Sequence, residues 1–180
     1  MNVSEIIRKK PYENIIFTLR RHPLTFVPIL FLFLILMIVP VVVYFLIDSL
    51  FQSLLQSPTI YPFTILAASV YYLSIYLFFY AYFIDYYLDM WVVTNDRIVD
   101  IEQHGLFHRV ITELDLFRIQ DVTADVLGIF PTLFRYGDVT VKTASSTSNI
   151  VFRNIPNPNH IRERLIRLAD EDRRFHLEHE

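Results

Sequence analysis

Two long uncharged apolar blocks constrain this chain more than any other feature. The first runs from Leu24 to Ile47 (LTFVPILFLFLILMIVPVVVYFLI) and the second from Ile60 to Ile84. As a helix, the first block would be about 36 Å long, which exceeds the ~30 Å hydrocarbon core of a bilayer. The residues that follow, 85–180, are too few to bury two such helices on every side. We therefore predict a transmembrane hairpin of two helices over residues 24–84.

The flanking charges predict how this hairpin is oriented. The segment before it, residues 1–23, carries five basic residues, namely Arg8, Lys9, Lys10, Arg20 and Arg21, whereas the connector at residues 48–59 has no Lys or Arg. Because basic flanks stay in the cytoplasm, we expect residues 1–23 and residues 85–180 there and the short connector outside. The predicted location is the plasma or inner membrane, in a multi-pass protein.

The segment before the first block permits two interpretations. Tyr12, Ile15, Ile16 and Leu19 fall at i, i+3, i+4 and i+7, which is the spacing of one face of a helix. One interpretation is an amphipathic helix at the membrane interface, whose basic end meets anionic lipid headgroups. The other is a turn before the span, in which the arginines only set the topology.

After residue 84 the periodicity changes from helical to alternating. Runs typical of strands are WVVTN and RIVDIEQ around an Asn-Asp turn, then RVITELDL, RIQDVTADV, GDVTVKT and IVFRNI. The last segment begins near residue 158 and places Ile161, Leu165 and Leu168 on one helical face. We predict an antiparallel sheet of six or seven strands over residues 85–168, capped by this helix, and a charged tail over residues 169–180.

Several motifs in this half occur together in a known family. WVVTNDRIVDIEQHGLF, ITELDLFRIQDV, LFRYGDVTVKT and FRNIPNPNHIRERL follow one another in order. Together with LRRHP before the first apolar block, they resemble the bacterial pleckstrin-homology (PH) domain of YdbS-like membrane proteins. The resemblance implies two transmembrane helices followed by a PH-like, partly open antiparallel barrel of seven strands with a C-terminal helix. It implies no catalytic activity.

The boundary between the two halves offers candidate membrane-interface residues. Asp85 and Asp89 lie at the end of the second helix, where negative charge opposes the helix dipole. Arg20 and Arg21 belong to the same membrane face, so we expect them to pair with these aspartates. Tyr86, Tyr87 and Trp91 are residue types that anchor chains at the interface.

The predicted first hairpin after the spans offers a candidate ligand or partner site at Arg97, His104, His108 and Arg109. We expect Arg109 to lie opposite Asp100 or Glu102, as an ordinary cross-strand pair. Inositide binding is not predicted, because Asp96, Asp100 and Glu102 offset these basic side chains.

Other chemistry receives little support from the sequence. The chain has no cysteine, and its histidines, including His176 and His179, form no zinc motif. No glycine-rich phosphate loop is present, so we predict no metal, no cofactor and no small-molecule substrate. Residues 85–180 contain 16 Asp and Glu against 11 Lys and Arg, which is not typical of a nucleic-acid-binding domain.

We therefore expect a non-enzymatic, membrane-anchored binding module. Its cytoplasmic domain would bind a protein partner, or assemble with its own copies, at the surface of the lipid bilayer. One alternative is the sensing of anionic lipid through the basic N-terminal helix. Another is the role of an accessory subunit in a membrane complex or transporter. A transport pathway would require acidic, basic or amide side chains inside the spans, and both blocks lack them.

Overall fold

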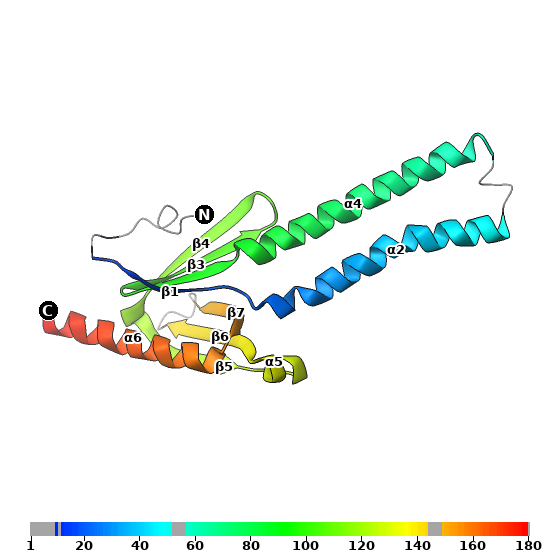
Figure 1. Ribbon diagram of the computed structural model, residues 1–180. Coiled ribbons are helices and arrows are strands. Elements are labelled where there is room, and N and C mark those ends of the chain that lie inside the picture. Colours follow the sequence, from blue (N-terminus) through cyan, green and yellow to red (C-terminus); the bar gives the residue numbers. More distant parts are fainter. Residues whose placement is uncertain (1–9, 11, 52–56, 144–148, 180) are drawn as a thin grey trace. The chain divides into compact units, whose positions relative to one another are not determined.

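The computed structural model describes residues 10, 12–51, 57–143 and 149–179, with side chains up to Arg174 (Figure 1). It divides into two compact units, which we describe separately. One unit consists of the segment that ends at His22 together with Asp85–Glu180, and is called the domain below. The other, Pro23–Ile84, is called the helical hairpin.

The helical hairpin contains the 3-10 turn η1 (Pro23–Thr25), α2 (Val27–Leu50) and most of α4 (Ile60–Leu88). Both helices are long and apolar enough to cross a membrane by length and composition. Within the described residues, α2 buries no side chain and α4 buries only Ile75. A helix that is apolar on all sides and exposes that surface is typical of a membrane segment.

Aromatic residues join the two helices of the hairpin. The Phe33 and Phe79 rings stack with their centroids 4.3 Å apart. The Tyr71 and Tyr72 hydroxyls donate hydrogen bonds to the carbonyl oxygens of Leu36 and Met37 in α2, at 3.0 and 3.2 Å. These tyrosines therefore bond to the neighbouring helix, which satisfies their hydroxyl groups without water.

The domain contains seven strands in two antiparallel sheets. The first sheet has the order β1 (Ile15–Leu19), β2 (Met90–Thr94), β3 (Arg97–His104) and β4 (His108–Asp115). The second has the order β5 (Ile119–Asp125), β6 (Tyr136–Thr143) and β7 (Ile150–Pro156). The 3-10 turn η2 (Leu116–Arg118) precedes β5, α5 (Ile129–Phe134) precedes β6, and α6 (Pro158–His179) follows β7.

This architecture confirms the predicted PH-like arrangement of antiparallel strands and a C-terminal helix, and the barrel is not closed. Each of the six strand-like runs after residue 84 forms a strand. The hairpin loop expected at residues 144–149 lies mostly outside the described residues, as do Arg8, Lys9 and residues 52–56 of the connector. The seventh strand comes from before the spans.

The predicted N-terminal helix is wrong. Residues 15–19 form β1, which pairs with β2 so that Thr18 lies opposite Val92 and Leu19 opposite Trp91. Hydrogen bonding to β2 and burial of Leu19 in the core favour the extended backbone over a helix. The predicted domain boundary therefore also changes, because this segment belongs to the domain and is not a separate region over residues 1–23.

The main core lies between the two sheets and α6. Its centre includes Trp91, Phe152 and Leu165, and the Trp91 and Phe152 ring centroids are 5.6 Å apart. The helix carries the core beyond its expected end, because Ala169 and Asp172 are also buried. Residues 169–179 of the predicted charged tail thus belong to α6, which continues to His179. The side chains of His176 and His179 lie outside those described.

Candidate functional site

The last turn of α4 is bound to the end of β3 through two aspartates. The Asp89 carboxylate accepts a hydrogen bond from the Gln103 N–H at 2.7 Å and pairs with the Arg21 guanidinium. Four residues earlier in the helix, Asp85 accepts a hydrogen bond from the Gly105 N–H at 2.8 Å. The expected pairing of arginine with aspartate is confirmed for Arg21 and Asp89, whereas Asp85 binds the turn between β3 and β4.

The Asp89 side chain is buried, and burial disfavours the charged form of its carboxyl. Desolvation raises the pKa of the Asp89 carboxyl above its usual range, and the Gln103 N–H and the positive charge of Arg21 partly oppose that rise. A buried carboxylate requires such partners to remain charged. The Arg21–Asp89 pair therefore joins the residues that follow β1 to the residues that follow α4.

The aromatic residues at this junction have different environments. The Arg20 guanidinium lies over the exposed Tyr87 ring, 5.2 Å from its centroid, as a cation–π contact. Tyr86 is half-buried. Trp91, predicted as an interface anchor, is instead 1% exposed in the core against Phe152. This prediction is wrong because residue 91 is already in β2, on the side of the strand that faces the second sheet.

The structure brings three of the four residues of the predicted hairpin site, His104, His108 and Arg109, to one end of the β3–β4 hairpin and places Arg97 at the other. Arg97 lies at the start of β3 and forms hydrogen bonds with Glu13 and Glu113. His104 and His108 lie at the other end of the hairpin with ring centroids 5.8 Å apart. Arg109 is opposite Gln103, not Asp100 or Glu102, and its Nε donates to Gln103 Oε1 at 3.3 Å. The register therefore corrects the expected cross-strand pair.

Exposed apolar side chains were not singled out from the sequence. One group, which we call the hairpin tip, comprises Leu106, Phe107, Val110 and Ile111. The second, the α5 cluster, comprises Leu127, Ile129, Phe130, Leu133 and Phe134. Leu106 and Phe107 lie in the GLF turn and the α5 cluster lies in LGIFPTLF, whereas Val110 and Ile111 lie in β4. The apolar residues at these two connections between strands were the available signal.

A groove of about 800 Å³ lies beside α6. It is lined by Tyr12, Ile16, Asn95, Asp96, Leu168, Glu171 and Asp172. Three of these side chains are acidic and three are large and apolar or aromatic, and none of the described lining residues is basic. Lys10 reaches the edge of the groove, where its ammonium group is 2.5 Å from Asp96 and lies over the Tyr12 ring.

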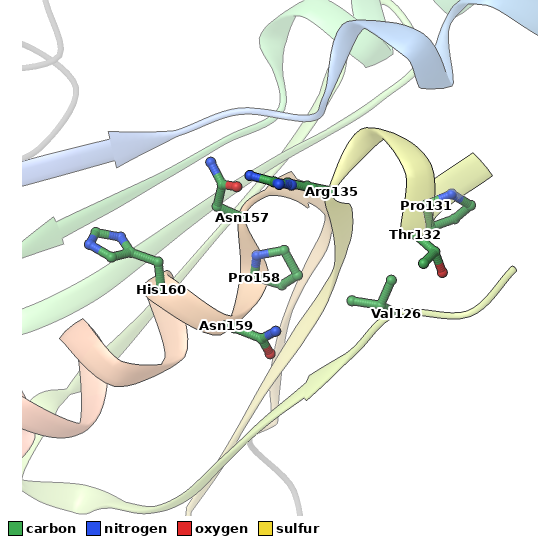
Figure 2. A pocket seen from close by; sticks show the side chains of 8 residues that line it. All are labelled: Val126, Pro131, Thr132, Arg135, Asn157, Pro158, Asn159 and His160. Atoms are coloured by element: carbon green, nitrogen blue, oxygen red, sulfur yellow. The ribbon is translucent and has the colours of Figure 1, made fainter. Parts of the chain in front are cut away.

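A second cavity of about 760 Å³ lies between α5 and the start of α6 (Figure 2). Pro131 and Thr132 line one side and Pro158 and Asn159 the other, with Arg135 beside Asn157. The Thr132 hydroxyl donates to the Gly128 carbonyl at 2.7 Å, within the first turn of α5. Among the described residues, no group of three or more His, Asp or Glu side chains is placed to hold a metal ion.

Comparisons with known proteins give a family match and a structural similarity. The sequence model of the bacterial PH-domain family matches residues 16–169. No curated protein matches. Among solved structures, the chain is similar to a DUF1696 family protein with a pleckstrin-homology domain from Shewanella loihica PV-4, with 15% identity and a TM-score of 0.37. That similarity covers 45% of this chain and 70% of the other.

Proposed function

Because this chain belongs to the bacterial PH-domain family, we propose that it is a non-enzymatic binding module, anchored in the cell membrane by α2 and α4. The domain lies on the cytoplasmic side and binds a protein there. The observation that carries the binding role is the acidic and apolar groove beside α6. The lipid-sensing alternative required an N-terminal helix and has no basis, because that segment is β1.

Composition supports the anchoring. Both helices expose apolar side chains on all sides. Soluble monomeric proteins rarely expose an apolar surface of this size to water. The basic residues Lys10, Arg20 and Arg21 precede α2, and no Lys or Arg lies in residues 48–59. The positive-inside rule therefore favours a cytoplasmic location for both ends of the hairpin.

We expect single cysteines to report this topology, since the natural chain has none. A membrane-impermeant maleimide should label Thr59→Cys in intact cells and should label Asn149→Cys only after the cells are permeabilised. Both positions are exposed, so access alone does not distinguish them. Labelling of Asn149→Cys but not Thr59→Cys in intact cells would reverse the proposed orientation.

The groove supports a partner segment that is both basic and apolar. Ile16 and Leu168 provide an apolar wall, and Asp96 and Glu171 provide negative charge. Within the chain itself, Lys10 already binds at the edge of this groove. Its ammonium group pairs with the Asp96 carboxylate and lies over the Tyr12 ring, as a lysine of a partner would. A short helix or strand that carries lysines beside leucines has the matching chemistry.

We expect the intact protein, in nanodiscs of zwitterionic lipid, to bind a labelled peptide of alternating leucine and lysine at least about tenfold more tightly than one of leucine and glutamate. Glu171→Lys should weaken the lysine peptide by a similar factor, because like charges meet in the groove. Glu163→Lys is the matched control, since Glu163 is exposed on the same helix and does not line the groove. Fluorescence anisotropy measures both affinities.

Equal binding of the lysine peptide by wild type and Glu171→Lys would exclude this groove as the site. A change in the oligomeric state of Glu171→Lys, measured by sedimentation in the same nanodiscs, would identify a second copy of the chain as the occupant.

A further inference from the structure

The domain exposes two groups of large apolar side chains that its own core does not use. In the hairpin tip, Phe107 is 97% exposed, and in the α5 cluster Leu127 and Ile129 are 85% and 83% exposed. Single exposed apolar residues are common on proteins, but contiguous groups mark surfaces that are covered by a partner. Each group comes from one short stretch of the chain, and a group of this kind marks a candidate interaction surface.

Local backbone geometry presents both groups outward. Gly105 has a φ of +69°, which allows the tight turn that projects Leu106 and Phe107 beyond the ends of β3 and β4. Gly128 has a φ of +109° immediately before α5, and Arg135 ends that helix in the left-handed conformation. Each group is therefore held by a defined turn.

The hairpin tip lies at the point where the chain enters the domain from α4. The Gly105 N–H donates to Asp85 Oδ1 at 2.8 Å, and Asp85 directly follows the last residue of the helical hairpin. The neighbouring Gln103 N–H binds Asp89. A hydrogen bond therefore connects the turn of the hairpin tip directly to the last turn of α4.

The α5 cluster lies close to the other point, where the chain leaves the domain for α2. The His22 ring stacks on the ring of Tyr136, with centroids 5.1 Å apart, and His22 is the last residue of the domain before the helical hairpin. The His22 N–H also donates to the Asn154 carbonyl at 2.7 Å. Tyr136 follows the end of α5 by two residues, so the cluster is attached beside this second junction.

Basic side chains accompany both apolar groups. Arg135 follows the α5 cluster, His108 and Arg109 follow Phe107, and all three are exposed. Arg20 lies over Tyr87 at the junction itself. Apolar side chains with cationic neighbours match the boundary between acyl chains and anionic headgroups.

We propose that the hairpin tip and the α5 cluster insert into the cytoplasmic leaflet of the membrane that α2 and α4 cross. This inference rests on the anchoring in the proposed function and extends it, since the domain then contacts the lipid at two further places. We choose the bilayer as the occupant because each group is attached beside a point where the chain connects to an apolar helix. If that helix spans the membrane, lipid lies near the group without a second binding event. The domain is then held at the membrane by its two chain connections and by these two inserted groups.

Single-cysteine variants of the full chain in lipid vesicles test the insertion. A nitrobenzoxadiazole label at Phe107→Cys or Ile129→Cys should be quenched by phosphatidylcholine with a nitroxide near the headgroup at least twofold more than the same label at Asp170→Cys. Asp170 is the control because it is exposed on α6, about 18 Å along the helix from Pro158. The substituted side chains contact solvent, so folding is retained, and Trp91 fluorescence verifies it in each variant.

A fourth label, at Val39→Cys in α2, separates this proposal from the anchoring. Iodide in the buffer quenches labels that are exposed to water. Quenching by lipid at residue 39, together with quenching by iodide at residues 107 and 129, would overturn the insertion and retain the anchoring. Iodide quenching at residue 39 would overturn the anchoring itself. Labels at residues 107 and 129 that are protected from both quenchers would show that a protein or a second copy covers these groups, and would also overturn the insertion.

Discussion

Replacement of Arg97 by alanine is expected to lower the free energy of unfolding of the domain by about 3–5 kcal/mol. The Arg97 Nε and Nη2 atoms each donate to a different oxygen of Glu13 at 2.9 Å, and Nη1 donates to Glu113 at 2.6 Å. The Glu13 side chain is fully buried. Loss of the guanidinium therefore leaves a carboxylate without its counter-charge inside the protein.

The pKa of Glu13 reflects the same contacts. Burial raises this pKa, but the hydrogen bonds from Arg97 and the Lys10 N–H outweigh burial, and the net effect is a lowered value. A carboxyl whose pKa is lower in the folded state stabilises the protein above its unfolded pKa, and this stabilisation is lost as the pH falls. In Arg97→Ala this contribution should disappear.

Urea titration of the full chain in detergent, followed by fluorescence, measures the effect. Trp91 is the only tryptophan and is buried in the domain core, so its emission reports unfolding of the domain and not of the helical hairpin. Arg118→Ala is the control, because its pair with Asp115 is exposed and should contribute less than about 1 kcal/mol.

A double substitution separates the ion pair from simple loss of packing. Glu13→Leu combined with Arg97→Met removes both charges and keeps apolar volume, so it should recover most of the lost stability. If Arg97→Ala costs no more than Arg118→Ala, the pair does not hold the segment before β1 to β3. Hydrogen exchange of the Ile15–Leu19 amides gives an independent measurement, since β1 should open more often in Arg97→Ala.

The strands after α4 were predictable because alternation and turns are local signals. Residues 136–141 alternate between partly exposed and buried positions, and Asn95 and Gly105 mark turns between strands. β1 was not predictable in the same way. Its five residues fit both a helical and an extended pattern, and its partner β2 lies about 70 residues later, beyond two helices.

Trp91 and Arg97 show why the site was predicted only in part. Trp91 follows an apolar helix, and in β2 all five residues are buried, so no alternation distinguished a core residue from an interface anchor. Glu13 and Arg97 are 84 residues apart and meet only because β1 joins the sheet. The Arg21–Asp89 pair was predictable, since the two residues flank the two ends of the predicted helical hairpin.

Asp100→Asn is expected to stabilise the domain by roughly 4 kcal/mol at pH 8.5 and by little at pH 4. Asp100 is 7% exposed in β3, and within the described structure its Oδ1 atom has no hydrogen-bond partner. Burial raises the pKa of its carboxyl from 3.8 to about 7, repulsion from Glu102 and Asp89 adds to the rise, and Arg153 opposes it. Asparagine resembles the neutral form that this environment prefers.

The direction of the pH dependence follows from proton binding. Between pH 4 and pH 7 the folded state retains a proton on Asp100 that the unfolded state releases, so stability falls as the pH rises through this range. Each pH unit between the two pKa values corresponds to about 1.4 kcal/mol, which gives roughly 4 kcal/mol in total. Above pH 7 the contribution should be constant.

The difference between variant and wild type reports Asp100 together with Glu102 and Asp89, the carboxyls that repel it, because the contributions of groups that do not interact with Asp100 cancel. Urea titrations at intervals from pH 4 to pH 8.5 should show this difference increasing with pH and then levelling off near pH 7. Asp170→Asn is the control, since that exposed carboxylate on α6 should give a small difference at every pH. A difference for Asp100→Asn that does not change with pH would mean that Asp100 is charged throughout this range, which requires a cation or water that solvates it in the folded protein.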